Sequence, residues 1–390
     1  MNPNPYFIKD GNELIDKISL EFFHRNNFKY IPIIDKYGII LKLLTLENSI
    51  IGKKNDNKKS SEKKVLIIGG AGYIGSVLTR YLLKKKFKVR VFDSLLYGDQ
   101  SIRNLTRRKD FDFILGDTRN IGLLNQAMEN VFAVIHLGEI VGDPACSLDE
   151  EYTFSVNFNG TRNVLNASVE KGVSKFIYAS SCSVYGFGRS LFTEKSKLNP
   201  ISFYAKTKVE CEKEILRYKN SISVSIMRLA TVFGLSYRPR FDLVFNLLCA
   251  QAFYEKQINL FGGNQWRPFI HVKDVAVGIE RLLRSSHKRI GGQIFNLGSS
   301  KLNIQLSALG TLIAGHLNGV NILKSIKKQD NRSYNVDFSK VSNDLNFSTS
   351  INFESGIKEI LQYFKKNRID RDSLKYLNNT IALLPESVPE

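Results

Sequence analysis

The chain has 390 residues, of which 43% are hydrophobic, a composition that suits one large α/β domain with additions or two to three modules. Its formal charge of +19 is spread without an aromatic-interleaved basic stripe, so we expect a solvated surface suited to anionic ligands and no nucleic-acid partner. No run of about 18 apolar residues, no signal peptide and no CxxC or histidine cluster is found, which predicts a cytoplasmic protein without a membrane span or a metal.

Residues 1–52 are predicted to form a small α+β appendage. Apolar residues with helical spacing over 12–23 precede two apolar strands around a turn at 35–38. The stretch IPIIDKYGIILKLLT resembles the strand pair in half of a CBS domain, a module that often senses adenine nucleotides. A docking or dimerisation appendage is the alternative. The lysine-rich, aperiodic stretch 53–64 is predicted to be a linker.

A glycine-rich turn after a buried strand is the strongest local feature of the chain. Four apolar residues, 65–68, run into Gly69, Gly72 and Gly75 and then into a helix. Such a turn lets the backbone approach a pyrophosphate closely, while the helix N-terminus supplies free amides. Asp93 closes the next strand about 20 residues on, where a carboxylate binds the adenosine ribose and repels a 2′-phosphate. The pattern predicts an NAD site.

From residue 65 onwards strands and helices alternate, which predicts a parallel sheet covered on both faces. We therefore expect an α/β protein with a Rossmann-type doubly wound sheet over 65–230. A smaller substrate-binding region at 231–369 is expected to be interleaved with that sheet, and 370–390 to form a tail. The expected strands are 65–69, 88–93, 111–115, 131–137, 174–180 and 222–228, with helices notably at 154–171 and 204–219.

Three side chains further along the chain suggest chemistry. Asp117 follows the third strand, where it lies near an adenine amino group or caps the next helix. Tyr204 and Lys208 share one helix face at i and i+4, and a lysine beside a phenol favours the phenolate, as does a nicotinium ring. Tyr204 can therefore act as a base nearer neutral pH. A serine-bearing strand end, 180–183, lies just before this helix.

As an ordered set these pieces resemble the extended short-chain dehydrogenase/reductase family, in its NAD-dependent nucleotide-sugar epimerase/dehydratase branch. The matching stretches cover about 65–365 and are GGAGYIGS (69–76), VFDSLLYG (91–98), GDTRN (116–120), VIHLGEIVGDP (134–144), NFNGTRNVLNA (157–167), YASSCSVYG (178–186), YAKTK (204–208) and RPFIHVKDVA (267–276).

The resemblance implies a role for individual residues. Tyr204 would be the catalytic base, Lys208 its partner and a ligand of the nicotinamide ribose, and Ser181 the hydroxyl that orients the sugar oxygen. Arg267 and Arg332 would bind the substrate diphosphate, while His271 and Asp274 would serve structure as a satisfied histidine and a helix cap. The residues implied to hold NAD are Gly69, Gly72, Tyr73, Ile74, Gly75, Asp93, Asp117, Thr118, Leu137, Asn157, Tyr204 and Lys208.

Two departures from the family pattern bear on the reaction. Sugar 4,6-dehydratases of the family carry an Asp-Glu pair where this chain has Cys182 and Ser183, and decarboxylases place a glutamate nearby, which disfavours both reactions. The usual pair of small residues after His-Leu is replaced by Gly138 and Glu139, which brings a carboxylate to the cofactor loop.

The function expected from the resemblance is an NAD-dependent 4-epimerase of nucleotide-diphosphate sugars. The alternatives are a 4-dehydrogenase or 4-ketoreductase of hexoses or heptoses, which would use the same residues, and a non-catalytic dinucleotide sensor. The family also implies a homodimer, for which the helices at 154–171 and 204–219 are the candidate interface.

Overall fold

A seven-stranded parallel sheet forms the centre of the protein, as seen in a computed structural model that describes residues 64–325, 332–367 and 379 and the backbone of 8–9, 30–34 and 40–45. The strand order is β14-β10-β8-β7-β4-β5-β6, and every neighbouring pair is parallel. The strands are β4 (Lys64–Ile68), β5 (Lys88–Asp93), β6 (Phe111–Leu115), β7 (Val131–His136), β8 (Lys175–Ser181), β10 (Ser223–Leu229) and β14 (Gln293–Leu297).

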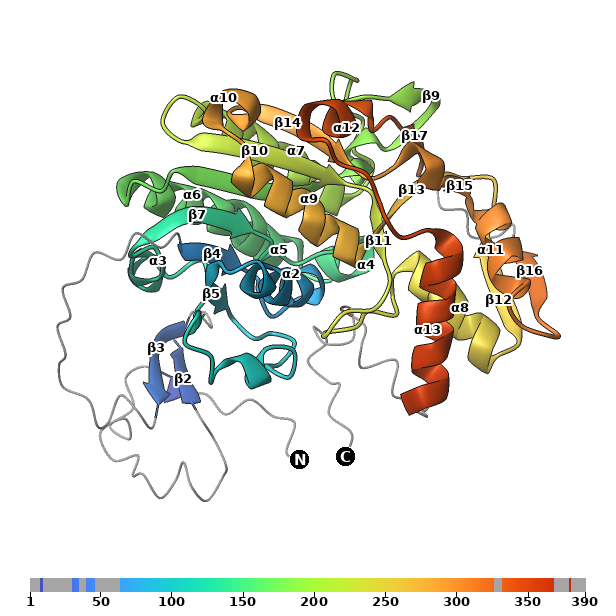
Figure 1. Cartoon of the computed structure of the whole chain (residues 1–390), viewed down its shortest axis with the longest axis horizontal. Helices are drawn as coiled ribbons and strands as arrows, with labels where there is room; N and C mark the ends of the chain where they lie inside the picture. The colour runs from blue at the N-terminus through green and yellow to red at the C-terminus, as the bar shows by residue number, and fades with distance from the viewer. Residues whose placement is uncertain are drawn as a thin grey trace, which may run out of the picture.

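Helices cover both faces of this sheet, so its inner strands are apolar on both sides. One layer holds α2 (Tyr73–Lys84) and α9 (Val272–Arg284), which lie in front of the sheet in Figure 1. The other layer holds α3 (Ile121–Ala127), α6 (Gly160–Glu170) and α7 (Phe203–Arg217). The predicted doubly wound α/β fold is confirmed. Strand β14, from the C-terminal part of the chain, lies at the edge of the sheet beside β10.

The helix expected at 154–171 is interrupted. It is built from α5 (Glu150–Phe154), a π-helical turn η3 (Ser155–Asn159) and α6. The turn points Asn157 inward, where its amide accepts from the Ile140 amide at 2.8 Å and donates to the Ile140 carbonyl at 2.9 Å. A local π-bulge of this kind occurs often at functional sites, and here it ties the helix to the loop that follows β7.

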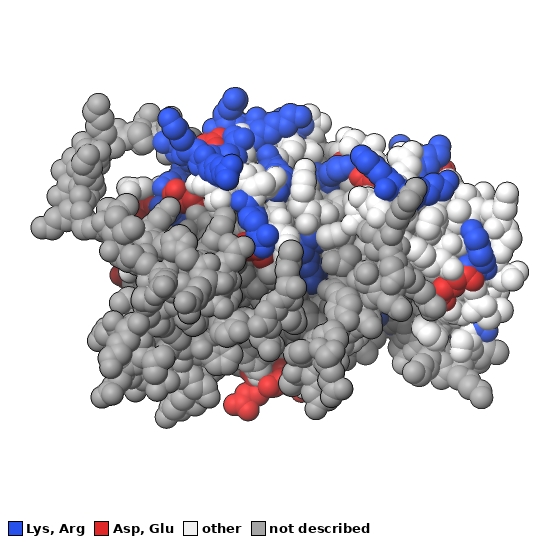
Figure 2. Space-filling view, turned by 90° about the horizontal axis from the view of Figure 1, so that it is seen from below, with Lys and Arg blue, Asp and Glu red and all other residues white. Residues whose placement is uncertain are grey.

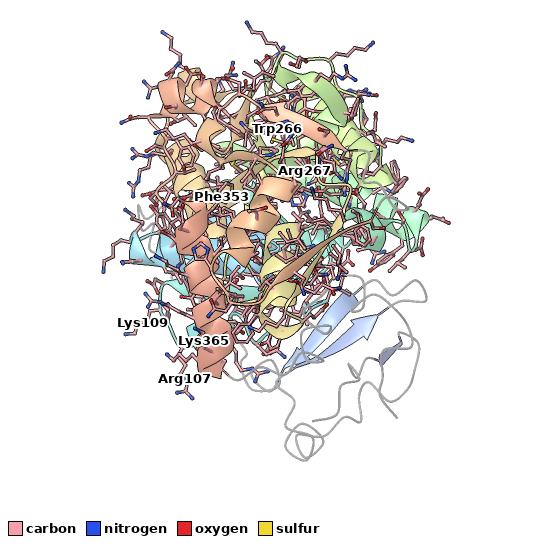
Figure 3. The ribbon with its side chains drawn as sticks, turned by 90° about the vertical axis from the view of Figure 1, so that its right-hand side faces the viewer. Arg107, Lys109, Trp266, Arg267, Phe353 and Lys365 are labelled. Atoms are coloured by element: carbon pink, nitrogen blue, oxygen red, sulfur yellow. The ribbon has the colours of Figure 1, made fainter. Side chains whose placement is uncertain are left out.

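A second hydrophobic core lies beside the sheet. It is formed by α8 (Val244–Tyr254), α11 (Leu306–Ala314), α13 (Phe353–Asn367), β12 (Gln257–Phe261) and β13 (Trp266–His271). Phe353 is buried in this core near the start of α13, whereas Lys365 lies near the end of the helix (Figure 3). Smaller elements complete the region: α4 (Asp143–Cys146), β9 (Phe187–Phe192), β11 (Thr231–Phe233), α10 (His287–Ile290), β15 (Asn303–Gln305), β16 (Asn321–Ser325), β17 (Ser333–Val336) and α12 (Ser339–Leu345).

The strand pair predicted in the N-terminal appendage is present. Strands β2 (Tyr30–Ile34) and β3 (Ile40–Thr45) are antiparallel, and β1 (Ile8–Lys9) pairs with β2. The helix predicted at 12–23, the linker at 53–63 and the tail apart from Asn379 lie outside the described residues.

Two surface properties bear on partners. On the face seen in Figure 2, the visible Lys and Arg side chains form several groups separated by neutral surface. Among the described helices, none combines the length and the apolarity that a bilayer crossing requires.

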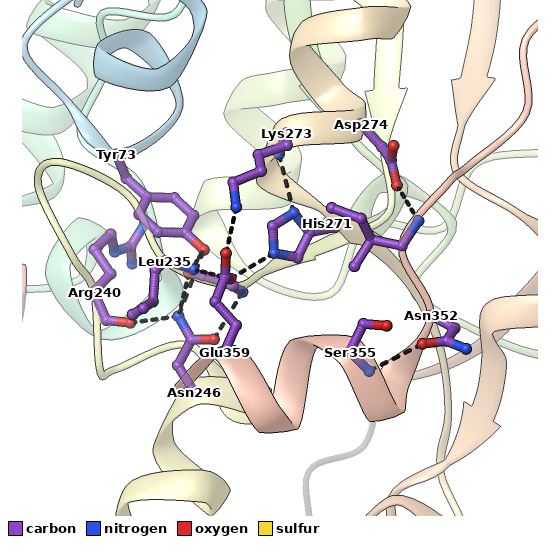
Figure 4. Close-up of polar contacts among 12 residues, drawn as sticks. Tyr73, Leu235, Arg240, Asn246, His271, Lys273, Asp274, Asn352, Ser355 and Glu359 are labelled. Carbon is purple, nitrogen blue, oxygen red and sulfur yellow. Dashed lines mark hydrogen bonds and ion pairs between the residues drawn. The ribbon is translucent and has the colours of Figure 1, made fainter. Parts of the chain in front are cut away.

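A polar network joins α13 to the start of α9 and to the loop after β11 (Figure 4). His271 is the N-cap of α9: its Nδ1 accepts from the Lys273 amide, so its Nε2 carries the proton and donates to Glu359 at 2.8 Å. The Leu235 amide and the Lys273 ammonium also bind Glu359. The cap is thus His271, not Asp274 as predicted. Asp274 instead accepts from the Ser350 and Ile351 amides, which anchors the segment before α13.

Glu359 is expected to make stability dependent on acid. Burial acts to raise its pKa, but hydrogen bonds from His271 and Lys273 outweigh this and hold the pKa at about 2, below the usual 4.5. The contribution is therefore complete above pH 4.5 and is lost as the pH falls towards 2. We expect Glu359→Gln to remove at most about 3 kcal/mol of this pH-dependent stability, measured by urea unfolding across that range. Glu354→Gln, on the exposed side of α13, is the control, and equal pH slopes for wild type and Glu359→Gln would contradict the assignment.

Candidate active site

The glycine turn between β4 and α2 forms a tight cradle. Gly69 has a φ of +79°, and a Cβ on it would lie 2.6 Å from the Gly138 Cα. A Cβ on Gly75 would lie 2.1 Å from the Gly69 carbonyl oxygen. Helix α2 begins after Gly72, which has no side chain to cap the first turn. A strand, a close turn and an uncapped helix N-terminus are what a dinucleotide pyrophosphate requires, so these residues fit NAD.

A pocket lies at the carboxyl ends of β4, β5, β6 and β7, next to this turn. It contains six of the residues predicted to hold NAD: Gly69, Gly72, Asp93, Asp117, Thr118 and Leu137. The pocket is also lined by residues that were not predicted to hold NAD, among them Leu96, Tyr97, Gly116, Glu139, Ile140 and Tyr152. Tyr152 lies in the short helix α5, outside every motif that the sequence analysis used, and no residue spacing would have identified it.

The two acids of this pocket are held by nearby donors. The Asp93 carboxylate accepts from the Ala71 and Leu95 amides, each at 2.8 Å, and burial raises its pKa. Asp117 forms a two-point ion pair with Arg119, with Nη2 to Oδ2 at 2.6 Å and Nε to Oδ1 at 2.9 Å. The helix-cap alternative for Asp117 is wrong, because the N-cap of α3 is Asn120.

Removing the charge of Asp93 is expected to weaken cofactor selection. Asn offers one acceptor and no charge where two amides now converge, so we expect Asp93→Asn to lower NAD affinity about tenfold or more. The preference for NAD over NADP should fall too, because the repulsion of a 2′-phosphate is lost. Titration calorimetry with both dinucleotides measures this. Asp110→Asn, whose carboxylate pairs with Arg108 away from the pocket, serves as the control, and an unchanged NAD/NADP ratio would disprove the role.

The three predicted catalytic residues are brought together where β8 meets α7. Ser181 ends β8, where its hydroxyl accepts from the Ser183 amide at 3.1 Å, and it lies close enough to Tyr204 to lower the pKa of that side chain. Tyr204 and Lys208 lie on the first turns of α7, with the Lys208 Nζ 5.8 Å from the centre of the Tyr204 ring. Lys208 also donates to the Ala179 carbonyl at 2.5 Å, which fixes its ammonium beside the sheet edge. The i, i+4 spacing thus yields the predicted arrangement.

The groups around Tyr204 shift its pKa in opposite directions. Burial raises the pKa of Tyr204, Lys208 lowers it, and Glu139 and Cys146 raise it. The Glu139 carboxylate lies 2.5 Å from the Lys208 ammonium, and both side chains are almost completely buried. This pair was absent from the predicted site, although the sequence shows a glutamate where the family has a small residue.

The two residues that replace the dehydratase acids are not poised to move a proton. Cys182 donates its thiol to the Arg228 carbonyl at 3.3 Å, and burial raises its pKa far above the usual value. The Ser183 hydroxyl is buried without a hydrogen-bond partner. Neither side chain supplies a carboxylate at the end of β8.

The predicted diphosphate ligands Arg267 and Arg332 lie next to each other. Arg267, labelled on β13 in Figure 3, donates to the Arg332 carbonyl and is buried. Arg332 pairs with Asp143, at the start of α4. Cys146, at the end of the same short helix, packs against Tyr204. The two arginines and Tyr204 are therefore connected through α4.

Three residues predicted to hold NAD have other contacts in the structure. Tyr73 donates its hydroxyl to the Gly234 carbonyl at 2.7 Å and is buried. Ile74 packs against the main core. The Asn157 amide is taken up by Ile140, as described above, so it supports the loop that lines the pocket.

Comparisons with known proteins show which family the chain resembles in sequence and in fold. The family model described as the NAD dependent epimerase/dehydratase family matches residues 65–298. A UDP-glucuronate 4-epimerase of Thermodesulfobacterium geofontis is 30% identical over 318 residues, covering 77% of this chain and 96% of that one. A dTDP-glucose 4,6-dehydratase of Actinoplanes sp. is 25% identical, over 78% of this chain and 98% of that protein. The solved UDP-glucuronic acid 4-epimerase of Bacillus cereus, in complex with UDP-glucuronic acid and NAD, is 28% identical with a TM-score of 0.69, covering 78% and 99%.

Proposed function

The chain belongs to the NAD dependent epimerase/dehydratase family, and on that premise we propose that it is a nucleotide-diphosphate-sugar 4-epimerase. The observation that carries the proposal is the grouping of Tyr204, Lys208 and Ser181 at the carboxyl end of β8, with no carboxylate at positions 182 and 183. Bound NAD supplies a hydride acceptor that can return the hydride. Epimerisation at C4 needs only this and one acid-base group.

Each residue of the proposed active site has a defined task in this reaction. Ser181 orients the sugar 4-oxygen towards Tyr204, which takes the hydroxyl proton as the C4 hydride leaves. In the second half of the reaction the 4-keto sugar would present its opposite face to the cofactor, and Tyr204 would return the proton to the 4-oxygen, so that no net oxidant is consumed. Lys208 holds the cofactor ribose beside Tyr204. Arg267 and Arg332 hold the diphosphate, because guanidinium groups bind phosphate oxygens at two points.

Dehydration is the reaction that the site supports least. Expelling the 6-hydroxyl requires one group that removes the C5 proton and one that protonates the leaving oxygen. The positions that dehydratases of the family use for this hold a buried thiol and a buried hydroxyl. The similarity to a dTDP-glucose 4,6-dehydratase therefore supports the fold and the cofactor rather than the reaction.

The test is to incubate the purified, NAD-loaded protein with UDP-, GDP-, CDP- and dTDP-sugars and follow NADH absorbance and sugar NMR signals. A new C4 epimer without net NADH is the expected result. Stoichiometric NADH with a ketone would replace the epimerase by the 4-dehydrogenase, and reduction of a 4-keto sugar would replace it by the ketoreductase. No conversion across the panel would support the dinucleotide sensor.

We also propose a homodimer that pairs α6 and α7 across a two-fold axis. Phe154, just before this helix pair, is 39% exposed and stacks on Phe158 at 4.9 Å, which leaves an aromatic patch at the end of the proposed interface. Light scattering of a stable monomer would contradict it. The four cysteines are buried free thiols, which supports a reducing compartment such as the cytoplasm as the site of action.

A further inference from the structure

Glu139 places a negative charge inside the catalytic centre. It belongs to the loop between β7 and α4, and its side chain is 2% exposed. One carboxylate oxygen, Oε2, lies 2.5 Å from the Lys208 Nζ. The other, Oε1, accepts from the Tyr178 hydroxyl at 2.7 Å and from the Thr161 hydroxyl at 3.3 Å. Two neutral donors and one cation therefore hold the carboxylate in a fixed position.

No second cation faces this carboxylate among the described residues that the contacts place around it. His136 reaches it only through Thr161, at 2.9 Å from that hydroxyl, and burial with the nearby Lys208 lowers the pKa of His136 to about 3, so it is neutral. Cys211 is a buried thiol whose pKa burial raises to about 12. Glu139 and Lys208 thus form an isolated buried ion pair, whose net charge is zero.

Tyr204 lies beside this pair and responds to both of its members. The charged or titratable groups facing it are Lys208 from its own helix, Glu139 from the loop after β7, and Cys146 from α4, and the Ser181 hydroxyl at the end of β8 lies close by. The lysine favours the phenolate and the carboxylate favours the phenol. Because the two opposite charges are only 2.5 Å apart, their fields at Tyr204 oppose one another, and Glu139 offsets part of the effect of Lys208.

We propose that Glu139 is a positioning residue that fixes Lys208 and offsets part of its charge beside Tyr204, so that Tyr204 can take the sugar proton and still return it. The inference rests on the proposed function and deepens it. An epimerase must keep the proton taken from the sugar until the hydride returns. A tyrosine next to an uncompensated lysine would favour the phenolate more strongly and would return the proton less readily, whereas the Glu139 carboxylate opposes that effect at Tyr204.

The test is a titration of Tyr204 that needs no sugar. Phenolate absorbance of the NAD-loaded enzyme is recorded against pH, and the Tyr204→Phe titration is subtracted to isolate Tyr204. Glu139→Gln leaves Lys208 uncompensated and is expected to lower the Tyr204 midpoint by about 1 to 2 pH units. Tyr178→Phe removes a hydrogen bond of Glu139 but not its charge and is the matched control, expected to keep the wild-type midpoint. An unshifted midpoint in Glu139→Gln overturns the proposal.

A double variant keeps the proposal testable if the uncompensated lysine prevents folding. Glu139→Gln with Lys208→Met removes both buried charges, which is tolerated better than removing one. If Glu139 offsets Lys208 at Tyr204, the midpoint moves by less than it does in Glu139→Gln alone; a rise of about 1 to 2 pH units would show that Lys208 acts without an offset and would refute the proposal. Both titrations are independent of the sugar panel, so failure of the epimerase proposal is seen separately.

Discussion

Replacing Tyr204 by phenylalanine is expected to lower kcat for sugar conversion by about 10² to 10⁴, because it removes only the oxygen that exchanges a proton with the substrate. The rest of the site should stay in place. The Tyr204 ring packs against Ile140, Ala145 and Cys146, contacts that phenylalanine keeps. Kinetics by NMR on the substrate found in the panel measures kcat, and dinucleotide titration measures NAD affinity, which should stay near the wild-type value.

Tyr218→Phe is the matched control for this experiment. Tyr218 is the C-cap of the same helix, and its hydroxyl donates to Asn166 at 2.7 Å on the outer side of the sheet. Its loss should leave kcat unchanged. Full biological activity of Tyr204→Phe would show that proton transfer by this residue is not required, and would favour the sensor over the enzyme.

A methyl group at Gly75 is expected to abolish NAD binding at concentrations that saturate the wild type. The new Cβ would lie 2.1 Å from the Gly69 carbonyl oxygen and 2.7 Å from the Gly70 Cα, both backbone atoms without freedom to swing aside. The turn and α2 must therefore separate, which displaces the amides that face the pyrophosphate. We expect a loss of affinity of about 100-fold or more, since each ångström of misplacement is costly in a preorganised site.

Gly122→Ala provides the comparison for Gly75→Ala. Gly122 lies in α3, where the nearest atom to a new Cβ is the Asn120 side-chain oxygen at 3.5 Å. Alanine is the better helix former, so this variant should bind NAD normally and be at least as stable as wild type. Circular dichroism distinguishes a displaced turn from global unfolding. Normal NAD affinity in Gly75→Ala would mean that the turn is not the pyrophosphate site.

Local patterns in the sequence were sufficient to predict the main sheet and the central part of the site. The apolar strand 65–68 and the following glycines predicted β4 and the turn, because strand burial and glycine conformation depend on a few adjacent residues. The i, i+4 spacing of Tyr204 and Lys208 predicted a shared helix face, and the structure places Ser181 beside them.

Other features depend on residues distant in the sequence and were missed or misassigned. Asp274 was predicted to cap a helix, yet its partners are Ser350 and Ile351, 76 and 77 positions away. The contact of Asn157 with the backbone of Ile140, made through a π-helical turn, was also missed, and its role towards NAD stays a prediction. No short-range periodicity encodes which loop a polar side chain meets when the chain has folded.

The sequence by itself determined the fold class, the glycine turn after β4 and the shared helix face of Tyr204 and Lys208, because hydrophobic periodicity, glycine and helical spacing act over a few residues. Only the tertiary structure decided which charged side chain lies beside Lys208. Glu139 and Lys208 are 69 residues apart in the chain and 2.5 Å apart in space, because β7 and β8 are neighbours and α7 packs on the same face. Both side chains are buried away from water, so each charge is stabilised by the other rather than by solvent.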